Sequence, residues 1–251
     1  MKTIRLIAGN DIKRQFAQPF AWILLALVTI LLAWQFLLLF EVYLELASKL
    51  NAADPRGASD SVALPVLRIL SGLLLLIAPL ATMQSLAGER RAHTLPLLLA
   101  AGVGNLRIVI GKFLGAFALV ALIVLIAVCM PLSLEFGTTL DLGRLAAATL
   151  GLLLFSASLT AIGIACSAWT AHPALAAAAA LIISSLLALI DMGARLQGVN
   201  NELINWMSLS THLEPFFFGL IASVDIVYFL LVTMLALLFA ARRLDSLRTR
   251  G

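Results

Sequence analysis

Long apolar stretches alternate with short polar segments along the whole chain, and this pattern sets the expected fold. About 20 apolar residues are needed to cross the hydrocarbon core of a bilayer as a helix. Six stretches reach or approach this length, and the last of them is somewhat short. The predicted spans are residues 20–40, 65–86, 113–134, 145–170, 173–190 and 226–241. The pattern therefore predicts an all-α membrane protein with six transmembrane helices in a single transmembrane domain, residues 1–251.

The N-terminal segment before the first span has a pattern of its own. Ile4, Ala8, Ile12 and Phe16 recur every fourth residue, which places them on one helical face. This favours an N-terminal interfacial helix, with its apolar face in lipid and its cations in water. The alternative is a plain basic tail that only sets the orientation of the protein.

The polar segments at the other ends of the spans are also partly helical by pattern. Glu41, Glu45 and Lys49 share one face, which predicts that the first span continues outward as a helix. Residues 213–223 are too few to cross the membrane and predict an external helical segment before span 6. Such a segment can be partly re-entrant only where protein shields its backbone. Charged residues at the outer span ends, such as Asp191, are expected to be solvated.

Small residues mark the places where helices are expected to pack closely. Gly111 and Gly115 form a small-xxx-small pattern at the start of the third span. The fourth span is rich in small residues, which include Gly151 and Gly163. We expect all four glycines to be helix-packing positions. Pro79 is expected to kink the second span, because proline removes a backbone donor.

The composition agrees with a membrane protein and leaves little for a soluble domain. Hydrophobic residues make up 62% of the chain and charged residues 12%, and the mean hydropathy is +1.07. Soluble domains average about 25% charged residues. The net charge of +4 does not indicate nucleic-acid binding, because the basic residues form small clusters between apolar runs. Two cysteines, Cys129 and Cys166, are too few for a disulfide scaffold.

The basic residues are distributed unevenly between the two sides. The N-terminal segment, the C-terminus and residues 88–115, which we call the elbow, hold four each, against five on the other side. Arg107 and Lys112 are counted here as elbow residues. Cytoplasmic segments carry the excess of Lys and Arg, so both termini and the elbow are expected to be cytoplasmic.

The sequence lacks the patterns that would indicate chemistry of its own. The elbow glycines have the wrong spacing for a phosphate-binding loop, and Phe113 stands where Ser or Thr would ligate magnesium. No bound cofactor and no metal site are expected, since the histidines are scattered. Ionisable residues avoid the middles of the predicted spans, whereas ion-coupled transporters usually keep some there. An ion-coupled transporter or channel is therefore the less favoured interpretation, and an enzyme is not expected.

Two elbow motifs carry a family resemblance. Residues 88–95 read Gly-Glu-Arg-Arg-Ala-His-Thr-Leu, and residues 107–113 read Arg-Ile-Val-Ile-Gly-Lys-Phe. Together they resemble the cytoplasmic loop of type-2 ABC transporter permeases. Pro-Leu-Ala-Thr-Met at 79–83 and Asp-Ile-Val-Tyr-Phe at 225–229 resemble the branch of gliding-motility permeases and of the permease for nitrous-oxide-reductase maturation. Gly88, Gln84 and Pro96 depart from the family pattern, and Pro96 implies that a coupling helix begins near Thr94 or is shifted in register.

The resemblance implies a permease subunit of an ATP-driven transporter of exporter type in the bacterial inner membrane. It implies a second permease copy, as a homodimer, and a separate ATPase subunit that binds ATP and Mg and pushes on a short cytoplasmic coupling helix between spans 2 and 3. The residues expected to meet that ATPase are Glu89, Arg90, Arg91, His93, Thr94, Leu95, Leu97 and Leu98. A membrane anchor for a periplasmic assembly factor stays open as a further alternative.

Overall fold

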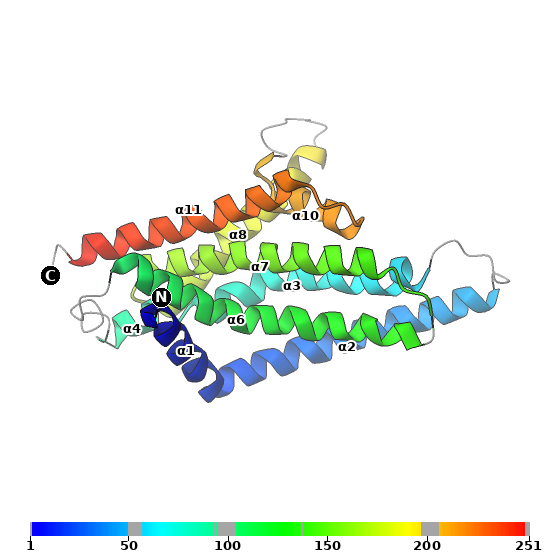
Figure 1. Ribbon diagram of the computed structural model, residues 1–251, viewed down its shortest axis with the longest axis horizontal. Helices are drawn as coiled ribbons and strands as arrows, with labels where there is room; N and C mark the ends of the chain where they lie inside the picture. Colours follow the sequence, from blue (N-terminus) through cyan, green and yellow to red (C-terminus); the bar gives the residue numbers. More distant parts are fainter. Residues whose placement is uncertain are drawn as a thin grey trace.

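The computed structural model is a bundle of long helices that run side by side along its longest axis (Figure 1). It describes residues 2–49, 57–92, 94, 104–136, 138–196 and 206–248. The long helices are α1 (Lys2–Ala17), α2 (Pro19–Lys49), α3 (Leu64–Thr82), α6 (Asn105–Leu132), α7 (Leu142–Trp169), α8 (Pro173–Leu196) and α11 (Ser223–Arg248). The short ones are η1 (Ser59–Ala63), α4 (Ala87–Arg91), η2 (Ser133–Phe136) and α10 (Leu209–Phe217).

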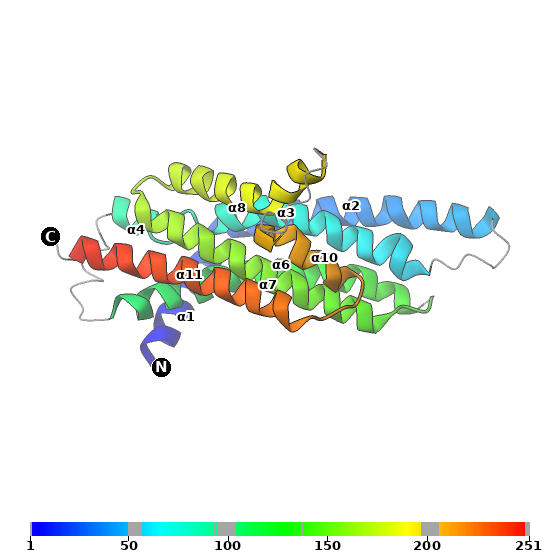
Figure 2. The same ribbon diagram turned by 90° about the horizontal axis from the view of Figure 1, so that it is seen from above.

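Six helical stretches are long and apolar enough to cross a membrane. They are Pro19–Glu45, Ser59–Arg91, Asn105–Phe136, Leu142–Trp169, Pro173–Asp191 and Ser223–Leu247. The prediction of an all-helical fold with six spans is thus confirmed, and the chain is a multi-pass membrane protein. The outward continuation of the first span is also present, because α2 extends without a break to Lys49 (Figure 2).

Two helices are longer than the spans predicted within them. α6 begins at Asn105, before the predicted span 113–134, so Arg107 and Lys112 belong to a helix and not to a loop. α11 begins at Ser223 and continues to Arg248, beyond both ends of the predicted span 226–241. Charged residues were taken as span ends, yet a helix continues through them wherever long cationic side chains reach water or a polar partner.

The second span is interrupted later than its proline suggests. α3 continues through Pro79 and ends at Thr82, and residues 83–86 then form a turn before α4. The Met83 amide donates to the Pro79 carbonyl at 3.0 Å, and the Ser85 amide donates to the Thr82 carbonyl at 3.0 Å. These bonds tighten the turn that redirects the chain into the elbow.

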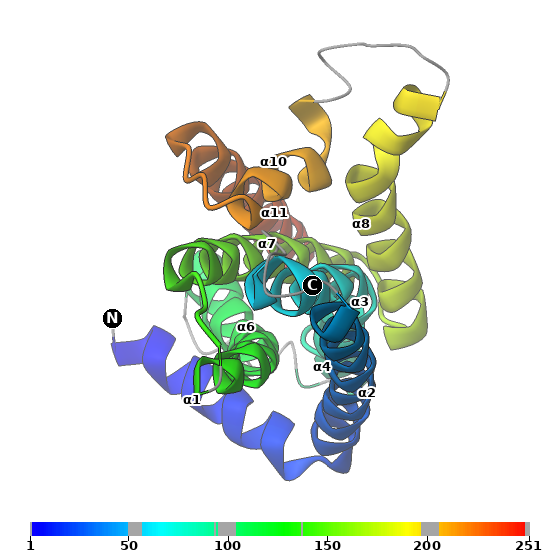
Figure 3. The same ribbon diagram turned by 90° about the vertical axis from the view of Figure 1, so that its right-hand side faces the viewer.

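α7 lies in the middle of the bundle, between α3 and α6 on one side and α11 on the other (Figure 3). In the most apolar 18-residue segment of α7, 67% is buried inside the protein, against 17% in the corresponding segment of α2. α7 therefore forms the core of the bundle and α2 its periphery. Leu152, Phe155 and Leu159 of α7 are fully buried or nearly so. The small residues of α7 allow its neighbours to pack this closely.

Each of the four glycines that the sequence singled out meets another helix at close range. A Cβ on Gly151 would lie 2.6 Å from Phe216 of α10, and one on Gly163 would overlap the Thr82 hydroxyl of α3. A Cβ on Gly111 would lie 2.7 Å from Ile7, and one on Gly115 would lie 2.7 Å from Asp11. The first two glycines therefore admit α10 and α3, whereas Gly111 and Gly115 admit α1.

α1 crosses the other helices obliquely at the end of the bundle where α4, the start of α6 and the C-terminus also lie (Figure 1). Its face with Ile4, Ile7, Ala8 and Asp11 turns toward α6, and Ala8 and Asp11 are buried. A lipid-facing apolar side was predicted for this helix. The structure corrects that expectation in part, because much of this side packs on protein.

We predict opposite effects for the same added methyl group at two glycines. Gly163→Ala should destabilise the protein by about 1–3 kcal/mol, because the Cβ is forced against Thr82. Gly72→Ala is the matched control in α3, since a Cβ there meets nothing within 4 Å. It should be neutral or stabilising by up to about 1 kcal/mol. Thermal unfolding in detergent measures both, and equal shifts would contradict the close contact between α3 and α7.

Candidate functional site

The first half of the elbow is anchored to α7 by one hydroxyl. The backbone N–H groups of Leu86 and Ala87, at the start of α4, both donate to Ser167 Oγ of α7, at 3.1 and 2.9 Å. The same hydroxyl donates to the Met83 carbonyl at 3.3 Å. Helix N-terminal amides have no partner within their own helix and need one elsewhere. A side chain of another span supplies it, so displacement of α4 strains its bonds to α7.

Lys112 of α6 provides the second anchor. Its side chain is 3% exposed, and its ammonium pairs with Asp11 Oδ1 of α1 at 2.8 Å. It also forms a short ion pair with Glu89 Oε1 of α4. Arg14 of α1 places its guanidinium 3.5 Å from the same Glu89 oxygen. One lysine thus connects three helices that are far apart in the sequence, and we call these four residues the ion cluster.

The charges of the ion cluster balance, since two cations face two carboxylates. This balance matters because an uncompensated buried charge costs several kcal/mol. Burial raises the pKa of the Asp11 carboxyl above its ordinary value, and the neighbouring Lys112 ammonium opposes that rise. Within the described structure, Glu89 Oε2 has no hydrogen-bond partner. Glu89 therefore holds Lys112 through one oxygen and retains a free acceptor.

The close approach of α1 to α6 depends on the two elbow glycines. Asp11 lies directly over Gly115, and Ile7 lies over Gly111. Any side chain at either glycine would push α1 away from α6, as the 2.7 Å distances to an added Cβ show. Lys112 lies between them in the sequence. The glycine pair therefore forms the surface on which α1 rests and brings Asp11 within reach of the lysine.

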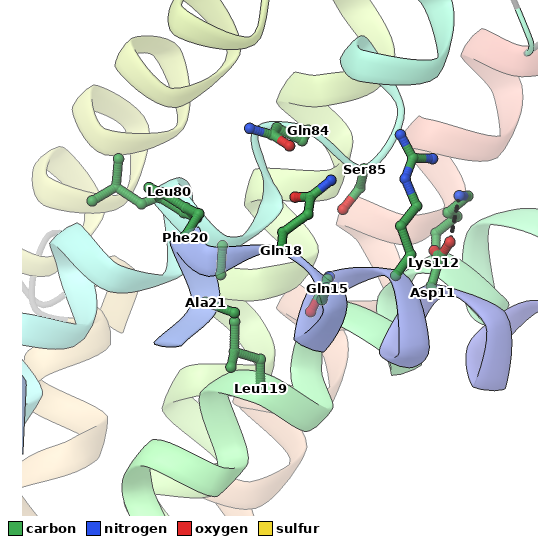
Figure 4. Close-up of a pocket in the computed structure, with 12 residues that line it drawn as sticks. Asp11, Gln15, Gln18, Phe20, Ala21, Leu80, Gln84, Ser85, Lys112 and Leu119 are labelled. Carbon is green, nitrogen blue, oxygen red and sulfur yellow. Dashed lines mark hydrogen bonds and ion pairs between the residues drawn. The ribbon is translucent and has the colours of Figure 1, made fainter. Parts of the chain in front are cut away.

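A small cavity of about 40 Å³ adjoins the ion cluster (Figure 4). It lies between α1, the start of α2, the end of α3 and α6, and Gln15, Gln18, Gln84 and Ser85 line its polar side. Gln15 Oε1 and Ser85 Oγ are buried and have no hydrogen-bond partner among the described residues. A cavity of this volume accommodates two or three water molecules, which would satisfy such atoms.

The joint between α1 and α2 is fixed by an aromatic pair. The Trp22 indole donates to the Phe16 carbonyl at 2.8 Å, and the two rings meet edge to face with centroids 5.9 Å apart. The Gln18 amide also donates to the Gln15 carbonyl at 3.2 Å. These contacts link α1 to the first span, so a push on α1 reaches both α6 and α2.

Comparison with known families decides what kind of protein carries this site. A family model described as ABC-2 family transporter protein matches residues 53–241. The chain belongs to this family. It is a membrane permease component of an ABC transporter, and ABC-2 membership implies an ABC ATPase partner. No curated protein sequence matches the chain.

The family match divides the ion cluster of this ABC-2 permease. Glu89 and Lys112 lie inside the matched range, whereas Asp11 and Arg14 lie before it. α1 thus contributes Asp11 and Arg14 from outside the matched region, and these residues pair with Lys112 and Glu89 inside it.

The predicted ATPase-facing residues of the permease differ in where the structure places them. Arg91 and Thr94 are exposed, and Arg90 is half-buried with its guanidinium 3.5 Å from the Trp169 carbonyl. Glu89 is turned inward into the ion cluster, so in this structure its carboxylate contacts its own chain. The remaining members, His93, Leu95, Leu97 and Leu98, lie outside the described residues. Contact of any of them with an ATPase stays a prediction.

Sequence reasoning missed the ion cluster although a signal for it was present. Asp11 is the only acid in a strongly basic N-terminal segment. It follows Ile4, Ile7 and Ala8 at helical spacing, so it shares their buried face. The expected face ran through Ile12 instead and left Asp11 at its edge. An acid on the apolar face of a basic helix indicates a cationic partner on the helix that it packs against.

The opposite end of the permease contains a second buried polar cluster. His212 of α10 places Nδ1 2.6 Å from Asp225 Oδ1 of α11 and Nε2 3.0 Å from the Trp206 carbonyl. An Nε2–H group can donate to the Trp206 carbonyl, and one proton lies between Nδ1 and Asp225 Oδ1. The ring stacks on Tyr228, whose hydroxyl donates to the Met207 carbonyl at 2.6 Å.

Two acids at this end, Asp191 and Asp225, are buried, which corrects the prediction that they are solvated, whereas Glu135 is exposed as expected. Asp191 is 6% exposed and accepts hydrogen bonds from the hydroxyls of Ser208 at 2.8 Å and Thr211 at 3.2 Å. Asp225 is 7% exposed and pairs with His212. α10, which is too short to cross a membrane, supplies partners for both acids. It is therefore bound to both α8 and α11.

We predict that the balance of charges stabilises the ion cluster more than any single contact within it does. Lys112→Met should destabilise the protein by about 3–5 kcal/mol, because two carboxylates stay buried without their cation. The triple variant Lys112→Met, Asp11→Asn, Glu89→Gln should recover most of that loss, since no net charge remains buried. Thermal unfolding in detergent provides the measurement.

Lys13→Met is the matched control, because Lys13 is exposed on the other side of α1. It should leave the unfolding temperature unchanged. A single Lys112 variant as stable as the control, or a triple variant as unstable as the single one, would contradict the ion cluster.

Proposed function

We propose that this chain is the permease subunit through which a separate ATPase subunit drives movement of the transmembrane helices. The observation that carries the proposal is the pairing of Lys112 with Glu89 on α4 and Asp11 on α1. The family resemblance implies that an ATPase would push on the elbow and on the N-terminal helix, and α4 and α1 belong to these two segments. Both are attached to the same point of α6, so a push on either one acts on the third span.

The contacts of α4 support a second route for the same push. Ser167 connects the start of α4 to α7, the most deeply buried span. α7 packs against α3, α6, α8 and α11, so its displacement would repack the whole bundle. Packed helices respond to such a push by shifting as bodies and not by bending continuously. The elbow would thus move the centre of the bundle without catalysis by this chain.

The finer features of the proposal follow the family. Both termini and the elbow would lie in the cytoplasm of a bacterial cell, with the spans in its inner membrane. Two permease copies would form a homodimer of exporter type, and ATP and Mg would be bound by the partner ATPase. The branch of gliding-motility and nitrous-oxide-reductase-maturation permeases is the proposed subgroup. The chain itself would supply no bound cofactor.

A second candidate function is mechanical action on a periplasmic partner. It is favoured by α10, which is bonded to α8 through Asp191, to α11 through Asp225 and to α7 through Phe217, whose carbonyl accepts from Arg144 at 3.3 Å. Three spans therefore converge on one short helix at the outer end. Movement that begins at the elbow would displace α10 and anything bound to it.

The contact with the ATPase is tested by reversing two charges of α4, at the beginning of the elbow. Arg90→Glu with Arg91→Glu should abolish co-purification of the ATPase subunit, because both side chains belong to the charged motif expected to meet the ATPase. Membrane insertion and the amount of permease should stay normal. The measurement is the ratio of ATPase to permease after affinity purification of the intact complex.

The control reverses two exposed cations at the same end of the bundle, Arg107 of α6 and Arg242 of α11. Arg107→Glu with Arg242→Glu makes the same change in net charge away from α4. This variant should keep its ATPase. Equal loss in both variants would point to general electrostatic attraction, and a normal ratio in the Arg90 and Arg91 variant would refute the elbow contact.

A further inference from the structure

An open cavity of about 610 Å³ lies between the start of α6 and the last turns of α11, at the elbow end of the bundle. Two exposed leucines, Leu106 and Leu238, stand in its lining beside polar groups from both helices. Its described lining consists of Gly104, Asn105, Leu106, Arg107, Leu238, Ala241, Arg242 and Asp245. The cavity is therefore amphipathic, and it joins the third span to the last one.

An aromatic stack marks the depth of this cavity in the membrane. Trp169, the last residue of α7, stacks on Phe239 of α11 with ring centroids 5.2 Å apart, and both rings are more than half exposed. The Arg243 guanidinium lies 4.7 Å from the centroid of the Trp169 ring. Exposed tryptophan near the end of a span is typical of the level where hydrocarbon meets headgroups. Arg242 follows Phe239 within one helical turn, so it lies at headgroup level although α11 continues beyond it.

Arg107 and Arg242 are the cations of the cavity, one from each helix. Both are exposed, and no described carboxylate forms an ion pair with either of them. The acid in the described lining, Asp245, is engaged within the chain, where it accepts a short hydrogen bond from the Asn105 amide. The two cations outnumber this acid, so the cavity attracts an anion.

The beginning of α6 adds to this attraction. No described side chain caps the helix, and a Cβ on Gly104 would meet nothing within 4 Å. The first amides of a helix have no partner within it, and the helix dipole places partial positive charge there. These N–H groups reinforce the two arginines and would not make a site without them.

An apolar stripe leads from the cavity toward the middle of the membrane. Leu231, Leu235 and Leu238 precede Arg242 at spacings of four, three and four residues, which places all of them on one face of α11. The three leucines are exposed. A small anion would leave this stripe unused, whereas the acyl chain of a lipid would cover it.

We propose that this cavity binds an anionic phospholipid of the leaflet on the elbow side, which is the cytoplasmic leaflet on the predicted orientation. Its phosphate would lie between Arg107 and Arg242, because guanidinium groups form paired, charge-assisted hydrogen bonds with phosphate oxygens. One acyl chain would extend along the leucine stripe of α11. A headgroup without an amine, as in phosphatidylglycerol, fits better than a zwitterionic one, whose ammonium would be repelled by the arginines. The proposal does not depend on how the ATPase is bound.

The test measures lipid binding to the delipidated full-length protein in detergent by native mass spectrometry. The probes are dioctanoyl-phosphatidylglycerol, dioctanoyl-phosphatidylethanolamine and glycerophosphoglycerol, which is the headgroup without acyl chains. The wild type should bind phosphatidylglycerol several-fold more tightly than either of the others. Arg107→Gln with Arg242→Gln should weaken phosphatidylglycerol binding about tenfold and remove most of that preference. Both side chains are exposed, so the unfolding temperature of this variant should stay that of the wild type.

Arg5→Gln with Lys13→Gln is the matched control, because both cations are exposed on α1 at the same end of the bundle and do not line the cavity (Figure 1). It makes the same change in net charge and should bind all probes as the wild type does. Equal weakening in both double variants would indicate general attraction to a basic surface and overturn the proposal.

Two other outcomes would also overturn it. Equally tight binding of glycerophosphoglycerol would assign the cavity to a free solute. Wild-type lipid binding by the Arg107 and Arg242 variant would show that the arginines do not hold a phosphate, and loss of the ATPase from that variant would assign them to a protein partner instead.

Discussion

The ion pairing of the buried Lys112 ammonium is the interaction on which the elbow end of this permease depends. The lysine side chain is almost entirely buried, so its charge must be met largely by protein, and the two carboxylates that meet it come from different helices. Removing a charge from hydration is costly, and the cost is recovered only with well-placed partners. The position of α1 and the position of α4 are therefore set by the same electrostatic requirement, in addition to apolar packing.

The opposite end of the bundle, which contains α10, meets a similar requirement in a different way. There the buried groups are Asp191, Asp225 and His212, and a nine-residue helix supplies most of their partners. Both ends thus use a short element, α4 or α10, that is bonded to several spans at once. Between them α7 packs against both ends, through Ser167 at one and through Gly151 with Phe216 at the other. Such an arrangement links the two faces of the membrane through one central helix.

The sequence was sufficient for the spans and insufficient for the polar contacts between them. Hydropathy predicts six helices because every helix in lipid satisfies its own backbone and needs only length and apolarity. Glycines at Gly151 and Gly163 indicated close packing because only small residues permit it. Lys112 was taken for a loop residue because its hydropathy is that of an exposed charge. Its partners are a hundred and one residues away at Asp11 and twenty-three away at Glu89, and no local pattern encodes such separations.

Local sequence patterns also failed to indicate the long-range contacts of the elbow and of α10. Glu89 was predicted to meet a partner because it stands in a charged motif, and that motif gave no sign of its pairing with Lys112 of the same chain. Asp191 and Asp225 were taken as solvated because they end hydrophobic runs. Burial of an acid depends on whether another segment folds over it, and that is decided by tertiary packing around α10.

The close packing of α1 on Gly111 and Gly115 has a practical consequence for handling this protein. Asp11 reaches Lys112 only when α1 (Lys2–Ala17) is helical and packed on α6, although α1 lies before the region that matches the family. Shortening the chain to its matched region would remove Asp11, one of the two acids that pair with Lys112. A bulky fusion at the amino terminus would displace α1 from α6. Affinity tags and fluorescent labels are better attached after Arg248, where α11 has already ended.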